Sequence, residues 1–306
     1  MTIFKLVNIA LTYKCNKNCD YCYSSALSNE YKDITEKDFL YVLKWLKACN
    51  ITKFNFIGGE PTVHTKIADF FKLSYKHGFK LNISTNLTFD KSILRSINDD
   101  TEFFVSLMDP ASYTNKEYEN FISNLSYVAD RKNIFNFIYI LREKNNIAHI
   151  VSLVKKYRPC KITLNYPAPN SYKSNYFIDK NELHKYEDKL MDIVSKMDAL
   201  GITTDTSRAY PRCCFSNKNI RFSSLCLAGE NSFVINPDLS IFPCVSLFLK
   251  GPSITTISDP EKFIPDYYIK KIDKLRWKNI LYEKCNTCAY YHRKKCQGGC
   301  LNYKIP

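Results

Sequence analysis

Short apolar runs alternate with helix-like stretches along the first 166 residues, and this alternation restricts the possible folds more than any other feature of the sequence. Six runs have the length and apolar content of buried strands: residues 5–11, 53–57, 80–85, 102–108, 135–141 and 161–166. Helix-like stretches lie near residues 35–48, 64–77, 90–97, 114–130 and 146–156. Such alternation favours a parallel sheet with right-handed crossovers. We therefore predict an α/β fold, a partial (β/α)6 TIM-like barrel, with its chemistry at the carboxyl ends of the strands.

The second part of the chain has a different composition. Residues 166–175 (YPAPNSYKSN) are typical of a linker, and a long helix is predicted near residues 180–200. Eight of the thirteen cysteines lie in the last third of the chain. The predicted domains are residues 1–205, with the partial barrel and the helix that follows it, and residues 206–306, a small cysteine-rich domain.

The composition argues against several kinds of protein. No apolar run approaches the ~18 residues of a membrane span, and the N-terminal segment has no signal-peptide cleavage site, so we expect a cytoplasmic protein with no membrane partner. The net charge is +14, but the basic residues are scattered, so nucleic acid is not the expected partner. In a reducing compartment the cysteine clusters indicate metal binding or catalysis rather than disulfides.

Three cysteines follow the first predicted strand. Cys15, Cys19 and Cys22 have the spacing C-x3-C-x2-C, and they lie where an α/β barrel presents its active-site loops. Three thiolates can bind three irons of a four-iron cluster, which leaves the fourth iron open. Zinc is the alternative, although a structural zinc site normally takes four ligands, usually in two spaced pairs. We predict an iron–sulfur cluster on this loop.

The segment CNKNCDYCY, residues 15–23, resembles the C-x3-C-x-aromatic-C signature of radical S-adenosylmethionine enzymes. The resemblance implies that the open iron of a [4Fe-4S] cluster binds S-adenosylmethionine, and that an electron from the cluster cleaves this cofactor to a 5'-deoxyadenosyl radical. The radical then takes a hydrogen atom from the substrate. The resemblance also implies that Tyr21 lies against the adenine of the cofactor; the alternative is a tyrosine that packs for stability.

The segment FIGGEP, at the end of the second predicted strand, resembles the family's motif for the amino group of the cofactor. Glycines allow a close approach of the backbone, and proline fixes the turn. The resemblance assigns four residues to cofactor binding: Gly58, Gly59, Glu60 and Pro61. Among these, Glu60 is expected to orient the amino group through a charge-assisted hydrogen bond.

Two later strand ends resemble the family less closely. Asn86 in ISTNL matches the third-strand ending, with Leu87 in place of the usual glycine. Ser106 in VSLMD matches the fourth-strand serine near the ribose of the cofactor, with Met108 where an aspartate is common. The resemblance therefore assigns Asn86 and Ser106 to cofactor binding; the alternative is that both are ordinary polar residues of strand ends. Arg142, after the fifth strand, is a weaker candidate.

The last third of the chain holds two dense cysteine segments. Residues 226–244 read CLAGENSFVINPDLSIFPC, and residues 285–300 read CNTCAYYHRKKCQGGC. Both resemble the SPASM or twitch extension of radical S-adenosylmethionine enzymes, which binds one or two auxiliary [4Fe-4S] clusters. The resemblance implies two ligand sets: Cys226, Cys244 and Cys300, and Cys285, Cys288 and Cys296.

The second ligand set lacks the distal cysteine of the full extension, since the chain stops six residues after Cys300. Either Cys213 or Cys214 could complete a site, one iron could stay open, or a single cluster could form. A zinc ribbon over residues 285–300 is a further alternative. Radical peptide epimerases return a hydrogen atom through a cysteine thiol, so the resemblance also makes Cys213 and Cys214 candidate catalytic hydrogen donors.

Four further residues with reactive side chains lie outside these motifs. Cys49 and Cys160 neighbour a helix end and a strand, and we expect both to pack in the interior. His64 and His292 have no supporting ligands in the sequence, and we expect packing or surface roles for both.

The resemblance implies an oxidoreductase that abstracts hydrogen from a ribosomally made peptide (RiPP) and leaves a crosslink or an epimerised residue. Val245 follows Cys244, where sulfatase-modifying members commonly place an acidic base, so that branch is not expected. The expected partners are the peptide, a separate leader-recognition protein, since the first strand starts close to the N-terminus, and an electron donor such as flavodoxin or ferredoxin. The alternatives are a small-molecule radical dehydrogenase and a non-catalytic zinc or iron–sulfur module that binds nucleic acid.

Overall fold

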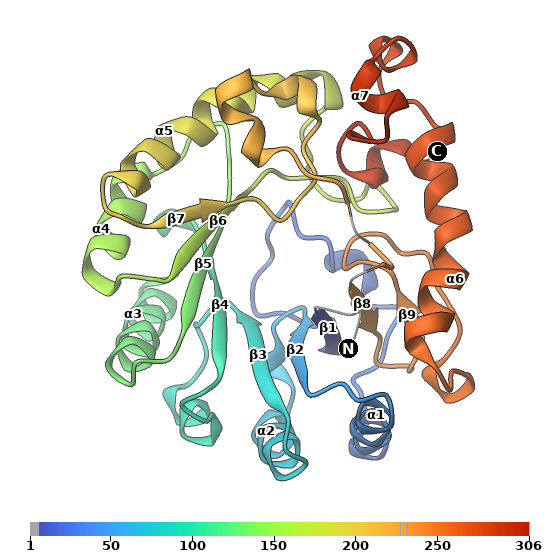
Figure 1. Cartoon of the computed structure of the whole chain (residues 1–306). Helices are drawn as coiled ribbons and strands as arrows, with labels where there is room; N and C mark the ends of the chain where they lie inside the picture. Colours follow the sequence, from blue (N-terminus) through green and yellow to red (C-terminus); the bar gives the residue numbers. More distant parts are fainter. Residues whose placement is uncertain (1–5, 227, 231, 306) are drawn as a thin grey trace.

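The computed structural model describes residues 6–226, 228–230 and 232–305, and these residues form a nine-stranded sheet with helices on its outer face (Figure 1). The strands are β1 (Leu6–Thr12), β2 (Lys53–Gly58), β3 (Lys80–Thr85), β4 (Glu102–Leu107), β5 (Phe135–Ile140), β6 (Lys161–Asn165), β7 (Thr203–Asp205), β8 (Ser232–Ile235) and β9 (Ile241–Phe242). Their order is β7-β6-β5-β4-β3-β2-β1-β8-β9. Neighbouring strands are parallel from β7 to β8, and β9 is antiparallel to β8.

The helices follow the strands in the expected alternation. The α-helices of the described residues are α1 (Glu36–Ala48), α2 (Ile67–Lys76), α3 (Asn115–Asp130), α4 (Ile147–Tyr157), α5 (Tyr186–Asp198), α6 (Pro260–Asp273) and α7 (Ala289–His292). The predicted partial (β/α)6 barrel is therefore confirmed, with Lys5 of the first predicted strand outside the described residues. The predicted helix near residues 90–97 is a 3-10 helix, Lys91–Ser96, and a second 3-10 helix, Lys180–Lys185, leads into α5.

The core lies between the sheet and its outer helices. In α1 the apolar residues recur at helical spacing, so one face of the helix is buried against the sheet. Phe39 on this face lies 4.4 Å from Phe70 of α2 and 5.8 Å from Phe56 of β2, measured between ring centroids. These aromatic contacts hold the first two β/α units together at the edge where the cysteine loop begins.

The last third of the chain extends the sheet of the barrel. β8 pairs with β1 in parallel register, from Leu6 opposite Ser232 to Ile9 opposite Ile235. Since parallel strands present their carboxyl ends at the same edge, the end of β8 faces the same mouth as the end of β1. The predicted second domain thus contributes a strand to the sheet of the first.

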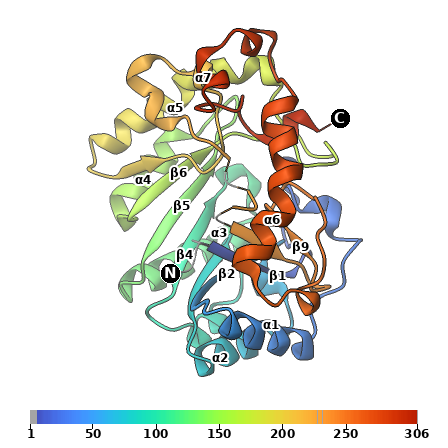
Figure 2. The same cartoon turned by 45° about the vertical axis from the view of Figure 1, so that its right-hand side comes forward.

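Helix α6 covers the added strands. It lies beside β9 in the turned view (Figure 2), where the Tyr268 hydroxyl donates to the carbonyl oxygens of Ile241 and Leu249 at 3.0 and 2.9 Å. The indole N–H of Trp45 in α1 donates to the carbonyl oxygen of Ile257 at 2.6 Å. The tail is therefore bonded to the barrel as well as paired with it.

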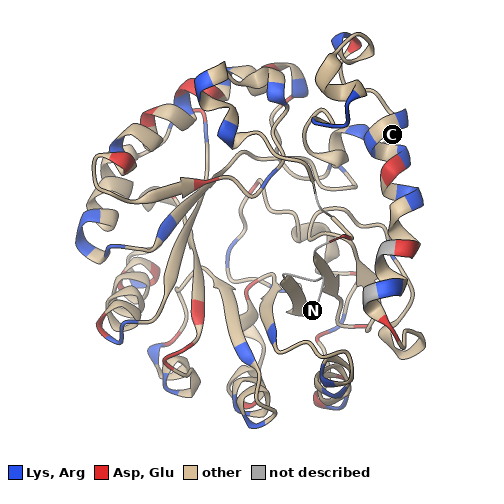
Figure 3. Cartoon of the chain, viewed as in Figure 1, with Lys and Arg blue, Asp and Glu red and all other residues tan. Residues whose placement is uncertain are grey.

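Charged side chains are distributed over the outside of the molecule. Figure 3 shows Lys and Arg on the outer helices and along α6, interspersed with Asp and Glu. This distribution agrees with scattered rather than clustered basic charge. None of the described helices is long and apolar enough to cross a membrane.

Candidate active site

The loop after β1 carries Cys15, Cys19 and Cys22, which we call the loop cysteines. Cys15 is exposed, and the other two are partly buried. A turn in which the Cys22 amide donates to the Cys19 carbonyl oxygen at 3.0 Å brings these two residues together. Burial raises the pKa of Cys19, a hydrogen bond with the Tyr21 side chain lowers it, and the neighbouring Cys22 raises it again.

The loop cysteines do not converge on a single point. Among the described residues, no group of three or more Cys, His, Asp or Glu side chains is arranged to hold one metal ion. In a four-iron cluster each thiolate binds a different iron, so the ligands need not converge in this way. Three soft thiolates on one loop suit an iron–sulfur cluster with one open iron better than they suit a tetrahedral zinc site.

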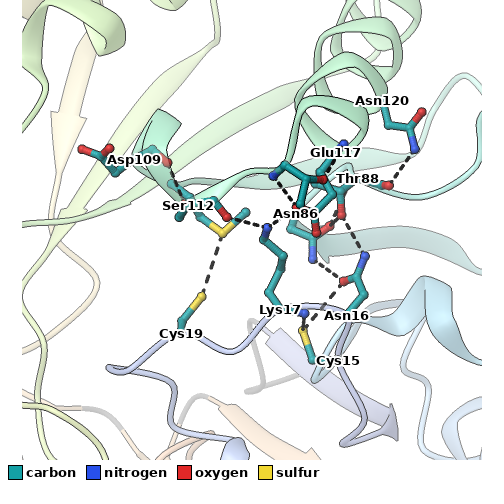
Figure 4. A network of polar contacts seen from close by, with 12 residues as sticks. Cys15, Asn16, Lys17, Cys19, Asn86, Thr88, Asp109, Ser112, Glu117 and Asn120 are labelled. Carbon is teal, nitrogen blue, oxygen red and sulfur yellow. Dashed lines mark hydrogen bonds and ion pairs between the residues drawn. The ribbon is translucent and has the colours of Figure 1, made fainter.

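Two ion pairs fasten the loop to the barrel mouth, one on each side of Cys19. The Lys17 ammonium donates to a Glu117 carboxylate oxygen at 2.8 Å and to the Ser112 carbonyl oxygen at 2.7 Å (Figure 4), and its side chain is only 9% exposed. Asp20 accepts both arms of the Arg142 guanidinium at 2.7 and 2.9 Å. A fork of this kind fixes orientation as well as distance. The loop is therefore held to α3 and to the end of β5.

Tyr21 packs beneath the same guanidinium. Its ring centroid lies 5.2 Å from the Arg142 carbon, and Tyr176 lies on another side of that cation at 5.6 Å. Burial raises the pKa of Tyr21 far above its usual range, so the hydroxyl stays protonated and can donate to Cys19. The predicted contact with adenine stays a prediction, because this packing also explains the residue.

Gly58 and Gly59 are required by the approach of β2 to the cysteine loop. A Cβ on Gly58, whose φ is +135°, would lie 1.9 Å from the Thr12 carbonyl oxygen, and one on Gly59 would lie 2.1 Å from that of Lys14. The Gly59 amide donates to the Thr12 carbonyl oxygen at 2.9 Å. The backbone of the loop thus fills the space that the sequence suggested for a ligand, and Pro61 begins the 3-10 turn that follows.

Glu60 is buried, and its carboxylate joins the ends of β2 and β3. Oε1 accepts from the Thr62 amide and hydroxyl and from the Thr85 hydroxyl at 3.3, 2.7 and 2.8 Å. Oε2 accepts from the Asn86 backbone amide at 2.8 Å. Burial raises the pKa of Glu60, although these hydrogen bonds lower it. Within the described residues Oε2 thus has one hydrogen bond, which leaves a lone pair for a further donor.

Asn86 connects the end of β3 to the cysteine loop. Its side-chain nitrogen donates to the Asn16 side-chain oxygen at 2.9 Å, and the Asn16 side-chain nitrogen donates to the Thr88 hydroxyl at 2.8 Å (Figure 4). Leu87 has φ +56°, in the left-handed region that favours glycine. That backbone conformation explains why the third-strand motif that this segment resembles usually has glycine at this position.

A cavity of about 880 Å³ opens between the cysteine loop and the ends of β4 and β5. This volume suits a cofactor-sized ligand. Of the predicted residues, Cys19, Tyr21 and Arg142 line the cavity. Ser106 lies inside β4, one residue before the lining begins at Leu107, and the FIGGEP residues lie outside the described lining.

The tail cysteines form two separate groups. The first tail group is Cys226, Cys244 and Cys300: burial raises the pKa of Cys226, and the other two thiols raise it further. The second tail group is Cys285, Cys288 and Cys296. The Cys288 amide donates to the Cys285 carbonyl oxygen at 3.3 Å. Burial raises the pKa of Cys285, and the thiols of Cys213 and Cys296 raise it further. The ligand set Cys226, Cys244 and Cys300 stays a prediction.

The remaining cysteines and histidines have different environments. Cys49 is buried as predicted, whereas the packing prediction for Cys160 is wrong, since this residue after α4 is exposed. His64 is buried, and its ring lies 4.8 Å from that of Phe70. His292 is at the surface. Neither histidine lies among the residues lining the described cavity.

Tyr23 is a residue of the site that the sequence analysis did not single out. Its hydroxyl donates to the Gly58 carbonyl oxygen at 3.2 Å. Burial raises its pKa, and the thiols of Cys22 and Cys244 raise it further. Tyr23 therefore lies between the cysteine loop and the first tail group. Its place directly after Cys22 was the only signal in the sequence.

A partial α/β barrel with a three-cysteine loop at the carboxyl ends of its strands defines a class of enzyme. Residues 9–156 match the family model of the Radical SAM superfamily, so the chain contains a radical SAM domain. Such a domain implies a [4Fe-4S] cluster and S-adenosylmethionine.

Similar solved structures cover nearly the whole chain. SuiB of Streptococcus suis bound to its precursor peptide SuiA has a TM-score of 0.74 and 17% identity, over 99% of this chain and 73% of that one. The anSMEcpe enzyme with bound AdoMet has a TM-score of 0.67 and 19% identity, over 96% and 89%. At these identities the likeness shows the fold.

Curated relatives match over shorter segments. An S-adenosylmethionine-dependent nucleotide dehydratase of Selenomonas ruminantium is 37% identical over 81 residues, which are 26% of this chain and 29% of that protein. A glycyl-radical enzyme activating enzyme described as putative, from Methanocaldococcus jannaschii, is 28% identical over 131 residues, 42% of this chain and 51% of that protein. The chain spans about a quarter to a half of the length of the curated relatives it matches.

Proposed function

We propose that the protein is a radical S-adenosylmethionine enzyme that abstracts hydrogen from a ribosomally made peptide, leaving a crosslink or an epimerised residue. The supporting observation is the likeness to SuiB, which extends over 99% of this chain and therefore includes the tail, in a structure that holds a precursor peptide. The physiological partners would be that peptide, a leader-recognition protein and a small electron donor such as flavodoxin or ferredoxin.

The loop cysteines would hold the [4Fe-4S] cluster, and S-adenosylmethionine would complete the open iron. When both are bound they supply a 5'-deoxyadenosyl radical. The chain's own task is to keep the loop in one place, and the partly buried Lys17–Glu117 pair and the Arg142–Asp20 fork do so. The cavity beside Cys19 would receive the cofactor and the reacting part of the substrate.

The cofactor's polar groups would meet residues at the ends of β2, β3 and β4. Glu60 has a lone pair left for the amino group of the cofactor, while Tyr21 would lie against its adenine. Asn86 and Ser106 are proposed as cofactor-binding residues because they lie near the ends of β3 and β4, and the carboxyl ends of parallel strands meet at one edge of the sheet. The glycines of FIGGEP would serve indirectly, by letting β2 pack against the loop.

The tail would bind auxiliary [4Fe-4S] clusters. Two observations support this proposal: Cys226 interacts with Cys244 and Cys300, and Cys285 interacts with Cys296. Soft thiolates are the ligands that iron–sulfur clusters require. We propose residues 1–205 as the catalytic domain and residues 206–306 as the auxiliary cluster domain, with β8 as the shared element. An auxiliary cluster near the mouth could accept an electron after hydrogen abstraction.

Co-expression with a candidate short precursor peptide tests the proposal. We expect mass spectrometry to find a peptide that has lost two hydrogens, or chiral amino-acid analysis after hydrolysis to find a D-residue in a peptide of unchanged mass. Replacing all three loop cysteines with alanine should abolish both the modification and 5'-deoxyadenosine formation, while Cys160→Ala, at an exposed cysteine outside the site, should preserve both. Cofactor cleavage by the triple variant would contradict the assignment of the loop.

A small-molecule substrate is the second candidate. The nucleotide dehydratase of Selenomonas ruminantium, although matched over only 81 residues, has the higher identity of 37%. Incubation of the reduced protein with nucleotides separates the two proposals. Nucleotide-dependent formation of 5'-deoxyadenosine and a dehydrated nucleotide would favour this second function over the peptide.

A further inference from the structure

The second tail group, Cys285, Cys288 and Cys296, has three thiols close to one another in the sequence. A cluster bound there needs a fourth ligand from elsewhere. Cys285 lies in the 3-10 helix Glu283–Asn286, Cys288 precedes α7, and Cys296 follows it. A [4Fe-4S] cluster held only by protein takes four thiolates. The chain itself can supply the fourth only from a segment that reaches this turn.

The segment before Cys213 does reach it. A Cβ on Gly299, whose φ is +100°, would lie 2.9 Å from the ring of Pro211, so the two segments touch. The Arg212 amide points at Cys296 with its nitrogen 3.5 Å from the sulfur, and the Gly298 amide lies 3.4 Å from the same sulfur. Amide groups directed at a cysteine sulfur are the usual surroundings of an iron–sulfur ligand. The contact also brings the next residue, Cys213, to the thiols.

Cys213 and Cys214 differ in their surroundings, which separates their roles. Cys214 is 7% exposed and belongs to the apolar core, whereas Cys213 is exposed. Cys213 interacts with Cys285, with a hydrogen bond from Cys214 and with the ammonium of Lys284. Cys213 is thus the thiol exposed for binding a metal, and Cys214 is a residue of the apolar core.

Lys284 interacts with Cys213, and Lys304 interacts with Cys285 and Cys296. Lys304 is buried, and its ammonium donates to the Arg276 carbonyl oxygen at 2.7 Å. No carboxylate of the described residues forms an ion pair with Lys304. A buried ammonium is costly unless an opposite charge compensates it. A cluster bound by four thiolates carries the negative charge that this lysine lacks.

We propose that Cys213 is the fourth protein ligand of an auxiliary [4Fe-4S] cluster whose other ligands are Cys285, Cys288 and Cys296. The inference rests on the proposed function, because it names the ligands of one of the auxiliary clusters proposed there. Four thiolates leave no open iron, so this cluster exchanges electrons and does not bind substrate. Cys213 bound in this way is not the hydrogen donor that the resemblance suggested.

The test uses the full chain with all three loop cysteines replaced by alanine, so that every remaining iron belongs to the tail. Anaerobically reconstituted protein is analysed for iron and zinc and by EPR, alone and with Cys213→Ala, Cys213→Ser or Cys214→Ala added. We expect Cys213→Ala to lose about half of the iron of its parent or to show a three-iron EPR signal. Cys213→Ser, which keeps an oxygen ligand, should retain a four-iron cluster with an altered spectrum, and Cys214→Ala should match the parent.

The outcomes separate this inference from the proposed function. A parent without tail iron, or with zinc, would overturn both the auxiliary clusters and the inference. A parent with tail iron, but with unchanged iron content and spectrum in Cys213→Ala, would overturn the inference alone. The same holds if Cys214→Ala, rather than Cys213→Ala, loses the iron. Circular dichroism of each variant shows whether a loss of iron follows from ligand removal or from misfolding.

Discussion

Replacement of Glu60 tests how the ends of β2 and β3 build the cofactor site. Its carboxylate accepts four hydrogen bonds from Thr62, Thr85 and Asn86. Two of these donors are hydroxyls, which can rotate to other acceptors, and two are backbone amides, which cannot. Alanine and glutamine therefore have different consequences, because only glutamine offers an oxygen to the Asn86 amide.

The expected costs follow from the donors that lose their acceptor. In Glu60→Ala the buried amides of Thr62 and Asn86 are orphaned, at about 1–3 kcal/mol each. Part of this loss is recovered, since burial raises the pKa of Glu60 and so shows that the ionised carboxylate is itself costly to bury. We expect a net loss of about 3 kcal/mol for alanine. In Glu60→Gln the side-chain oxygen faces the Asn86 backbone amide and the hydroxyls accept from the side-chain nitrogen. Only the Thr62 amide, which makes the longest of the four bonds at 3.3 Å, then loses its acceptor, so the loss is about 1 kcal/mol.

Urea unfolding followed by circular dichroism measures these losses, and equilibrium binding measures affinity for S-adenosylmethionine. Both variants lose the charged partner of the amino group, so we expect affinity to fall about tenfold or more. Glu36→Gln, at a 44% exposed carboxylate, is the matched control and should change neither quantity beyond about 0.5 kcal/mol. If Glu60→Gln loses as much unfolding free energy as Glu60→Ala, the Thr62 and Thr85 hydroxyls do not turn to accept from the glutamine nitrogen. Wild-type affinity in Glu60→Gln would show that the carboxylate only positions β2 and β3.

Two further predictions concern the packing around the loop. The ring nitrogens of His64 face the Ile34 carbonyl oxygen and the Lys66 amide, both at 3.1 Å, and burial lowers its pKa from 6.5. The neutral His64 ring therefore contributes stability above pH 6.5, and this contribution is lost as the pH falls through the lowered pKa. His64→Phe should reduce the difference between the urea midpoints at pH 7.5 and pH 5.5. An undiminished difference would exclude His64 as its source. Arg142→Gln breaks a partly exposed fork with Asp20, so the free energy of unfolding should change by about 1 kcal/mol or less. The KM for S-adenosylmethionine should nevertheless rise several-fold, and Arg142→Lys should lower it only part of the way back. An unchanged KM would mean that the fork is not needed to hold the loop.

The fold was predictable where strands are long enough to show a pattern. The run 80–85 matches β3 residue for residue, because its apolar residues, Leu81 and Ile83, alternate with polar ones. β7 and β9 have three and two residues, too short for a pattern of period two. β8 is set by pairing with β1, a contact between residues more than 220 positions apart, and no local signal reports such pairing.

The site was predictable in its residue types and less so in their contacts. The sequence placed the loop cysteines and the FIGGEP segment at the ends of the first two strands, and in the structure the Gly59 amide donates directly to the end of β1. The fork between Asp20 and Arg142 was not predictable, because its partners are separated by 122 residues. Cys213 could be proposed as a ligand from its type, but its nearness to Cys285 depends on the packing of Pro211 on Gly299.

The attachment of the tail explains why two cysteine sites come together at one mouth. The Tyr13 hydroxyl, two residues before Cys15, donates to the Asn236 side chain just after β8 at 2.7 Å, so the ends of β1 and β8 are joined. Tyr23, at the other end of the cysteine loop, interacts with Cys244 of the first tail group. Both ends of the loop thus contact the tail. Because the Tyr13–Asn236 hydrogen bond is buried, a change in the tail that disturbs β8 should also disturb the loop. We therefore expect the barrel mouth to form completely only when both parts of the chain are folded.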